Sequence, residues 1–160
     1  MKTENVIKRS VDRALKSVEF LRKSNTWYRD LEETVLLVEV QKSNFGEQHY
    51  INVGVFVKGI PATYMGKLPP RENECHIRIR IEGLAPDAEE SYRHMLNLED
   101  ESVGVTERQQ LVERAIADVV LPFLFQCSTR TGIRDAHIRG HLDRALVNKS
   151  LRESVFPGNS

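Results

Sequence analysis

Two histidines in the C-terminal half have the spacing of a metal site. His137 and His141 are four residues apart, so a helix would place both imidazoles on one face, as in zinc proteases. Position 138 is an isoleucine, whereas such a protease needs a glutamate there as its general base. Since the pattern also lacks a third ligand, we predict no metal site and no cofactor.

Arg130 and His137 suggest a second chemistry, that of a nuclease. An arginine and a histidine at this spacing occur in some all-helical ribonucleases, where the pair would activate and stabilise phosphoryl chemistry. The strand-rich first half does not suit that fold, and neither a glycine-rich phosphate loop nor a nucleophile elbow accompanies the pair. An enzyme acting on a phosphate-bearing substrate remains the alternative hypothesis, and we assign no catalytic residue.

Polar residues on the predicted strands are suited to binding a partner and not to catalysis. They combine aromatic area, amide groups and fixed positive charge, which suits a protein partner or an anionic ligand. The candidate binding residues of this polar sheet face are Arg29, Glu39, Gln41, Tyr50, Asn52, Arg78 and Arg80. The alternative is a merely solvated face on which Arg78 or Arg80 pairs with Glu39, worth about 1 kcal/mol or less.

The elements that must position these residues are strands in the first half of the chain. Apolar and polar residues alternate, or β-branched and aromatic residues concentrate, at 26–29, 34–42, 48–58 and 75–81. A turn at 43–47 joins two of these segments into a hairpin, in which we expect Gly54 to form a bulge or bend. We predict an antiparallel meander of about four strands.

Helices are expected before and after the strand segments in the sequence. Apolar residues recur at helical spacing over 7–21, 87–98, 106–124 and 133–148, with Pro122 kinking the third segment. This order favours an α+β fold, with helices packed on one sheet face and a helical C-terminal half. We predict a single domain over residues 1–153 and a flexible C-terminal tail over 154–160.

Composition limits the compartment and the partner. The net charge is zero, which argues against a nucleic-acid partner. The longest apolar run is far shorter than a membrane span, and the first ten residues lack the apolar stretch of a signal peptide. Cys75 and Cys127 are the only cysteines, so we expect buried free thiols in a cytoplasmic protein without a membrane anchor.

Several short sequence motifs resemble those of a known family. They are Phe20, Lys23, Asn25-Thr26-Trp27-Tyr28-Arg29, Val40-Gln41-Lys42-Ser43, Ile51-Asn52-Val53-Gly54-Val55, Cys75-His76-Ile77, Arg80-Ile81 and Leu121-Pro122-Phe123-Leu124. Together they resemble the bacterial family known as domain of unknown function 4304. That family has no assigned reaction, so the resemblance implies a fold and a set of family-like positions: Arg29, Gln41, Lys42, Asn52 and Arg80.

These observations favour a non-catalytic binding module that uses its polar sheet face. We expect a protein partner, and an immunity-type protein that neutralises a toxin is one form of this hypothesis. A homo-oligomer that buries the same face is a further alternative.

Overall fold

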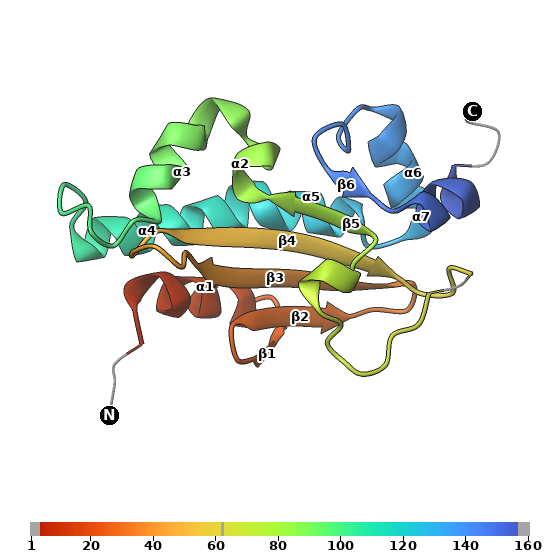
Figure 1. Ribbon diagram of the computed structural model, residues 1–160, viewed down its shortest axis with the longest axis horizontal. Coiled ribbons are helices and arrows are strands. Elements are labelled where there is room, and N and C mark those ends of the chain that lie inside the picture. Colours follow the sequence, from red (N-terminus) through yellow and green to blue (C-terminus); the bar gives the residue numbers. More distant parts are fainter. Residues whose placement is uncertain (1–3, 62, 157–160) are drawn as a thin grey trace.

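Six antiparallel strands form one sheet in which neighbours in sequence are neighbours in space. The computed structural model describes residues 4–61 and 63–156 (Figure 1). The strands are β1 (Leu21–Lys23), β2 (Thr26–Asp30), β3 (Thr34–Lys42), β4 (His49–Val57), β5 (Ile77–Arg80) and β6 (Leu146–Val147). The predicted meander is confirmed, and the short edge strands β1 and β6 extend it beyond the four strands expected.

The inner face of the sheet carries the main core. Leu36 and Val38 on β3 pair with Val55 and Val53 on β4, and all four side chains are fully buried. Because cross-strand partners point to the same side of a sheet, these apolar pairs form one continuous surface. Burying each such side chain stabilises the fold by about 1.5–3 kcal/mol.

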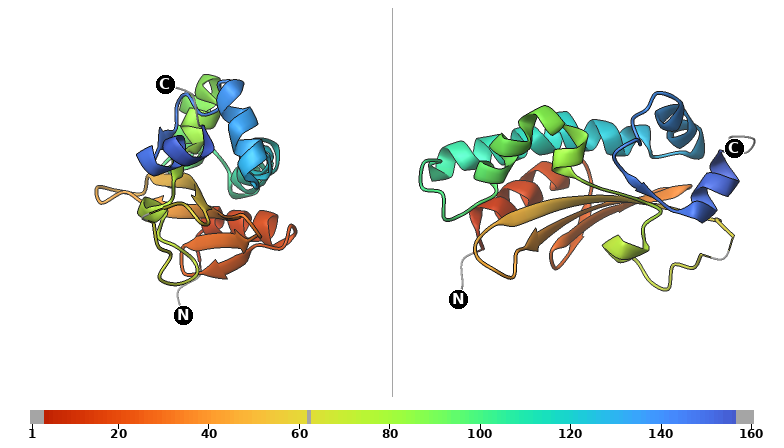
Figure 2. Two further views of the ribbon diagram at one scale, coloured as in Figure 1. Left: turned by 90° about the vertical axis from the view of Figure 1, so that its right-hand side faces the viewer. Right: turned by 45° about the horizontal axis from the view of Figure 1, so that its top comes forward.

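The α-helices pack against this inner face, as predicted (Figures 1 and 2), while one short 3-10 helix, Glu72–Glu74, lies on the outer face. The helices are α1 (Val6–Lys16), α2 (Ile81–Leu84), α3 (Glu89–Met95), α4 (Val105–Ala115), α5 (Leu121–Gln126), α6 (Arg130–Ile138) and α7 (Lys149–Val155). The side chain of Asn5 caps α1 by accepting a 2.9 Å hydrogen bond from the Lys8 amide. Trp27 fixes α1 to the sheet, since its fully buried ring donates from Nε1 to Asp12 at 2.9 Å.

A π-helical turn, Ile116–Val120, joins α4 to α5 directly before Pro122. The Leu121 amide donates to the Ile116 carbonyl, five residues earlier, and Pro122 has no amide hydrogen to donate. The predicted irregularity at Pro122 is therefore a widened turn in a helix that continues on both sides.

The outer face of the sheet is divided into two halves. A second, smaller apolar cluster covers one half and consists of Val35, Leu37, Phe56 and Cys75, with Tyr28, Met65 and Leu68 packed against it. Cys75, Met65 and Leu68 belong to the proline-rich segment between β4 and β5. This segment folds back over the sheet, while the other half stays open.

Gly54 permits that close packing. It pairs regularly with Leu37 and Arg78, so the expected bulge or bend is absent at this position. A Cβ atom at Gly54 would lie 2.8 Å from Cys75 Sγ. The glycine is needed because another segment approaches the strand closely.

The C-terminal region differs from the prediction in two ways. The helix expected over 133–148 ends at Ile138 as α6, and the chain then turns, adds β6 to the sheet and forms α7. Val155 and Phe156 are buried, so packed structure extends three residues beyond the predicted domain boundary at 153. The rest of the predicted tail, 157–160, lies outside the described residues.

Candidate functional site

A row of polar residues crosses the open half of the outer face. Strand pairing places Lys23, Thr26, Glu39, Asn52 and Arg80 side by side, one from each of β1 to β5. Directly paired residues share a face, so all five side chains start from the same side of the sheet. We call this set the polar row.

Asn52 is the centre of the polar row. Its Nδ2 donates to Glu39 Oε1 and to Gln41 Oε1, each at 2.9 Å, and its Oδ1 accepts from Arg80 Nε at 3.2 Å. The Asn52 residue is only 6% exposed, and the cost of burying its amide is offset because its donors and its acceptor are all engaged. Asn52 therefore fixes the positions of three neighbouring polar side chains.

Arg80 is held from a second direction by Tyr50. The guanidinium carbon lies 4.0 Å from the centre of the Tyr50 ring, within the range of a cation–π contact. Arg80 also donates to Gln41 Oε1 at 3.4 Å. The arginine is nevertheless exposed, so its charge is presented to solvent in a defined position.

Arg78 lies in the next row of the same face and has a different partner. Its Nε and Nη2 donate to the two carboxylate oxygens of Glu72 at 3.0 and 3.1 Å. This paired hydrogen bond raises the pKa of Arg78. Among the described residues neither Arg78 nor Arg80 pairs with Glu39, because β4 separates β3 from β5 and Asn52 stands between Glu39 and Arg80.

Arg29 does not lie on this face. It pairs with Leu36, an inner-face residue, and has the same strand parity as the buried Trp27. Its guanidinium approaches the Val18 carbonyl and the Glu19 carboxylate, each at 3.5 Å, and lies 5.8 Å from the Phe125 ring centre. The placement of Arg29 among the outer-face residues was wrong, whereas the other six candidates share the outer face.

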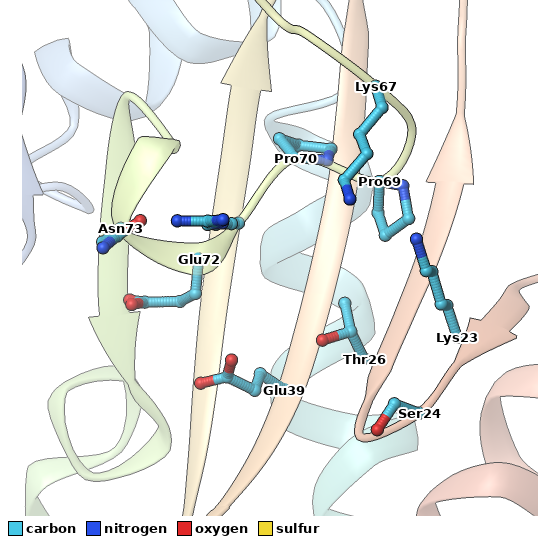
Figure 3. Close-up of a pocket in the computed structure, with 10 residues that line it drawn as sticks. Lys23, Ser24, Thr26, Glu39, Lys67, Pro69, Pro70, Glu72 and Asn73 are labelled. Carbon is cyan, nitrogen blue, oxygen red and sulfur yellow. The ribbon is translucent and has the colours of Figure 1, made fainter.

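Two adjoining cavities follow the polar row. One has a volume of about 420 Å³ and lies between the β1–β2 turn and the proline-rich segment (Figure 3). The other has a volume of about 550 Å³ and extends over β4 and β5 to Leu146 on β6. Glu39, Glu72 and Asn73 line both cavities, so we treat the two as one depression, the outer groove.

Figure 3 shows the first part of the groove. Lys23 reaches in from the end of β1 and Lys67 from the proline-rich segment, so that both ammonium groups lie on the same side. The carboxylates of Glu39 and Glu72 lie on the other side. In this part of the groove, the two lysines are thus separated from the two glutamates.

Sequence reasoning missed several residues of the groove. Lys23 and Thr26 belong to it because β1 and β2 extend the row, and Lys67, Arg71, Glu72 and Arg144 reach it from loops or short turns. The signal for Thr26 was available, since it has the opposite strand parity to the apolar Trp27. The loop residues gave no such signal because alternation does not extend into loops.

A comparison with family models identifies the chain. The model described as Domain of unknown function (DUF4304) matches residues 11–126, which includes every predicted site residue and most of the sheet. The chain belongs to this family. No curated protein and no solved structure matches it. The DUF4304 match includes the second half of α1, from Val11 onward, and the whole proline-rich segment, both of which help build the groove or its support.

The residues of the suggested metal site and of the suggested nuclease pair make contacts within the fold. His141 lies beyond the end of α6, and its Nδ1 is 3.0 Å from Gln126 Oε1. His137 stacks on Phe156 at 4.0 Å, and Arg130 donates to the Lys58 carbonyl. Within residues 4–61 and 63–156, no group of three His, Cys, Asp or Glu residues could hold a metal ion.

Both cysteines are free and buried, as expected. Desolvation raises the pKa of Cys127 to about 12 and raises the pKa of Cys75 even further above its ordinary value. Thiols in such surroundings are poor nucleophiles at neutral pH. In the part of the chain that the structure describes, no helix is long and apolar enough to cross a membrane.

Proposed function

We propose that this DUF4304 domain is a non-catalytic binding module of a bacterial cytoplasmic protein, and that it recognises a partner protein through the outer groove. The observation that carries the proposal is the preorganised cluster of Asn52, Arg80 and Tyr50 on rigid strands. Side chains fixed before binding lose little conformational entropy when a partner docks. An immunity-type protein that neutralises a toxin would use such a surface.

A capture experiment tests the proposal. Tagged full-length protein and the variant Arg78→Glu/Arg80→Glu would be used to capture partners from native lysate of the source cells, with circular dichroism confirming that the variant is folded. We expect the wild type to retain a specific partner that the variant loses. Retention of every partner by the variant would remove the groove from consideration.

A matched control separates the groove from general charge effects. Arg9 on α1 and Arg114 on α4 are exposed and lie on the helical side of the molecule, away from the groove. The variant Arg9→Glu/Arg114→Glu makes the same charge change as the groove variant and should retain the partner. Light scattering of the purified wild type would detect the alternative, a homo-oligomer that buries the groove.

The alternative of an enzyme acting on a phosphate-bearing substrate has its own test. Purified protein would be incubated with labelled RNA and DNA, with and without divalent metal ions. Cleavage that Arg130→Ala or His137→Ala abolishes would favour the enzyme and count against a purely binding role.

A further inference from the structure

We infer that the outer groove takes an extended acidic segment of the partner, about six residues long, with its acidic side chains near both ends. This inference rests on the proposed function and specifies the ligand of that site. It is carried by the number, the position and the spacing of the charges that line the groove.

Basic side chains outnumber acidic ones in the groove. Arg78 and Glu72 neutralise each other through their paired hydrogen bonds, which leaves Glu39 as the only other acid among the described residues that line the groove. The remaining basic residues are Lys23, Lys67, Arg71, Arg80 and Arg144. All five are exposed, and among the described residues no carboxylate lies within 4.0 Å of their charged nitrogens. The groove therefore favours an anionic ligand.

The basic residues gather at the two ends of the groove. Lys23, Lys67 and Arg71 line only the cavity beside β1 and β2. Of the two cavities that form the groove, Arg80 and Arg144 line the one over β4 and β5, while Glu39 lines both. A ligand with its negative charges at both ends would meet cations there and avoid Glu39 in the middle.

Strand spacing sets the length of the ligand. Lys23 and Arg80 occupy the first and last positions of the polar row, which spans the five strands from β1 to β5. Neighbouring strands are about 4.8 Å apart, so the row is about 19 Å long. An extended peptide covers about 3.3 Å per residue, so about six residues match this length.

A protein segment fits this charge pattern better than a nucleic acid does. The phosphates of a nucleic acid carry one negative charge at each nucleotide, and some would face Glu39 wherever the strand lay. A peptide can instead place neutral residues opposite Glu39. The groove thus selects for a pattern of charge along the ligand in addition to its total charge.

Two peptides of identical composition test the pattern. Fluorescently labelled, end-blocked Glu-Glu-Ser-Ser-Glu-Glu has its acids at the ends, and Ser-Glu-Glu-Glu-Glu-Ser has them in the middle. Fluorescence anisotropy at low ionic strength should show that the first peptide binds about fivefold more tightly, because the second moves two carboxylates from cations toward Glu39. Equal affinities for the two peptides would overturn the inference.

Variants at each end of the groove assign the binding to its residues. Lys23→Glu/Lys67→Glu and Arg80→Glu/Arg144→Glu should each remove the preference for the first peptide, and Arg9→Glu/Arg114→Glu should keep it. Glu39→Gln should narrow the difference between the peptides, since it removes the central negative charge. A preference that survives both end variants would contradict the inference.

A nucleic acid serves as the competing probe. Labelled hexauridylate should bind more weakly than Glu-Glu-Ser-Ser-Glu-Glu under the same conditions, and tighter binding of the RNA would overturn the peptide assignment. If neither peptide binds while Arg78→Glu/Arg80→Glu still loses the captured partner, the ligand class is wrong but the proposed site stands. If that variant keeps the partner, the proposed function itself fails.

Discussion

Phe56 and Tyr50 are aromatic residues on one face of one strand, and their surroundings are opposite. Phe56 is 4% exposed, contacts His76 edge-on with 4.7 Å between ring centres, and belongs to the smaller apolar cluster. Tyr50 is only partly buried and carries Arg80 over its ring. The covering segment makes this difference, since it turns half of the outer face into core and leaves the other half available for binding.

Truncation of the two aromatic residues should show the largest difference in stability between the two halves. Phe56→Ala should lower the free energy of unfolding by about 3 kcal/mol, because it leaves a cavity under the proline-rich segment. Tyr50→Ala should lower it by less than about 1 kcal/mol, since the ring is already partly solvated. Urea denaturation followed by fluorescence of Trp27, the only tryptophan, measures both. Similar losses for the two variants would mean that the halves do not differ in packing.

Gly54 tests how closely the covering segment must approach. Gly54→Ala should destabilise the protein by about 2 kcal/mol, because the added methyl group would stand 2.8 Å from Cys75 Sγ. Gly66→Ala is the control, since its Cβ would meet nothing closer than a Tyr64 ring atom at 3.6 Å. In a double-mutant cycle, Cys75→Ala should recover part of the loss at Gly54. Additive effects would show that the sulfur atom is not the obstacle.

Asn52 tests the order within the open half. Asn52→Ala should lower the free energy of unfolding by about 1 kcal/mol, a modest loss because Glu39 and Arg80 can turn to water. Binding to the groove should weaken in the same variant, since Arg80 loses its fixed position. Asn44→Ala, at an exposed turn position, should change neither quantity. Unfolding curves and peptide anisotropy would be measured on the same samples. A loss of stability without a loss of peptide binding would contradict a positioning role for Asn52.

The covered half should respond to acid through His76. Its Nδ1 accepts a 2.9 Å hydrogen bond from the Val57 amide, and burial together with nearby Arg130 lowers its pKa from 6.5. The unfolded chain therefore binds a proton more readily than the folded one, and stability falls as the pH drops below about 6.5. His49, whose pKa is also lowered by burial, adds to the same trend.

The variant His76→Asn isolates that contribution. Asparagine can keep an acceptor near the Val57 amide but does not titrate. The free energy of unfolding should therefore depend less steeply on pH between pH 6.5 and 5, by an amount that corresponds to less than about one bound proton. Denaturation curves at several pH values provide the measurement. An unchanged slope would show that His76 does not sense acid in the folded protein.

The central hairpin could be predicted from the sequence because its pairing depends on residues that are close together in the chain. Alternation along β3 and β4, with a short polar turn between them, determines which residues share a face. Glu39, Gln41, Tyr50 and Asn52 were accordingly placed on one face correctly. Arg29 was misplaced: it has the strand parity of the buried Trp27 and therefore belongs to the inner side of β2.

What the sequence did not reveal depends on contacts between distant segments. β1 has three residues and β6 has two, too few for a period to be recognised. Lys67, Arg71 and Arg144 enter the groove only after the proline-rich segment and the chain beyond α6 have packed against the sheet. Their charges were visible in the sequence, but their common location was not.

The hydrogen bonds of Asn52 also bear on the order of folding. Its partners Glu39 and Gln41 are 13 and 11 residues away in the chain, so these contacts have low sequence separation and close within a single hairpin. A hairpin of this kind forms in microseconds, whereas the bond to Arg80, 28 residues away, requires the intervening loop to close first. The centre of the groove can therefore form within the hairpin before its Arg80 end is added.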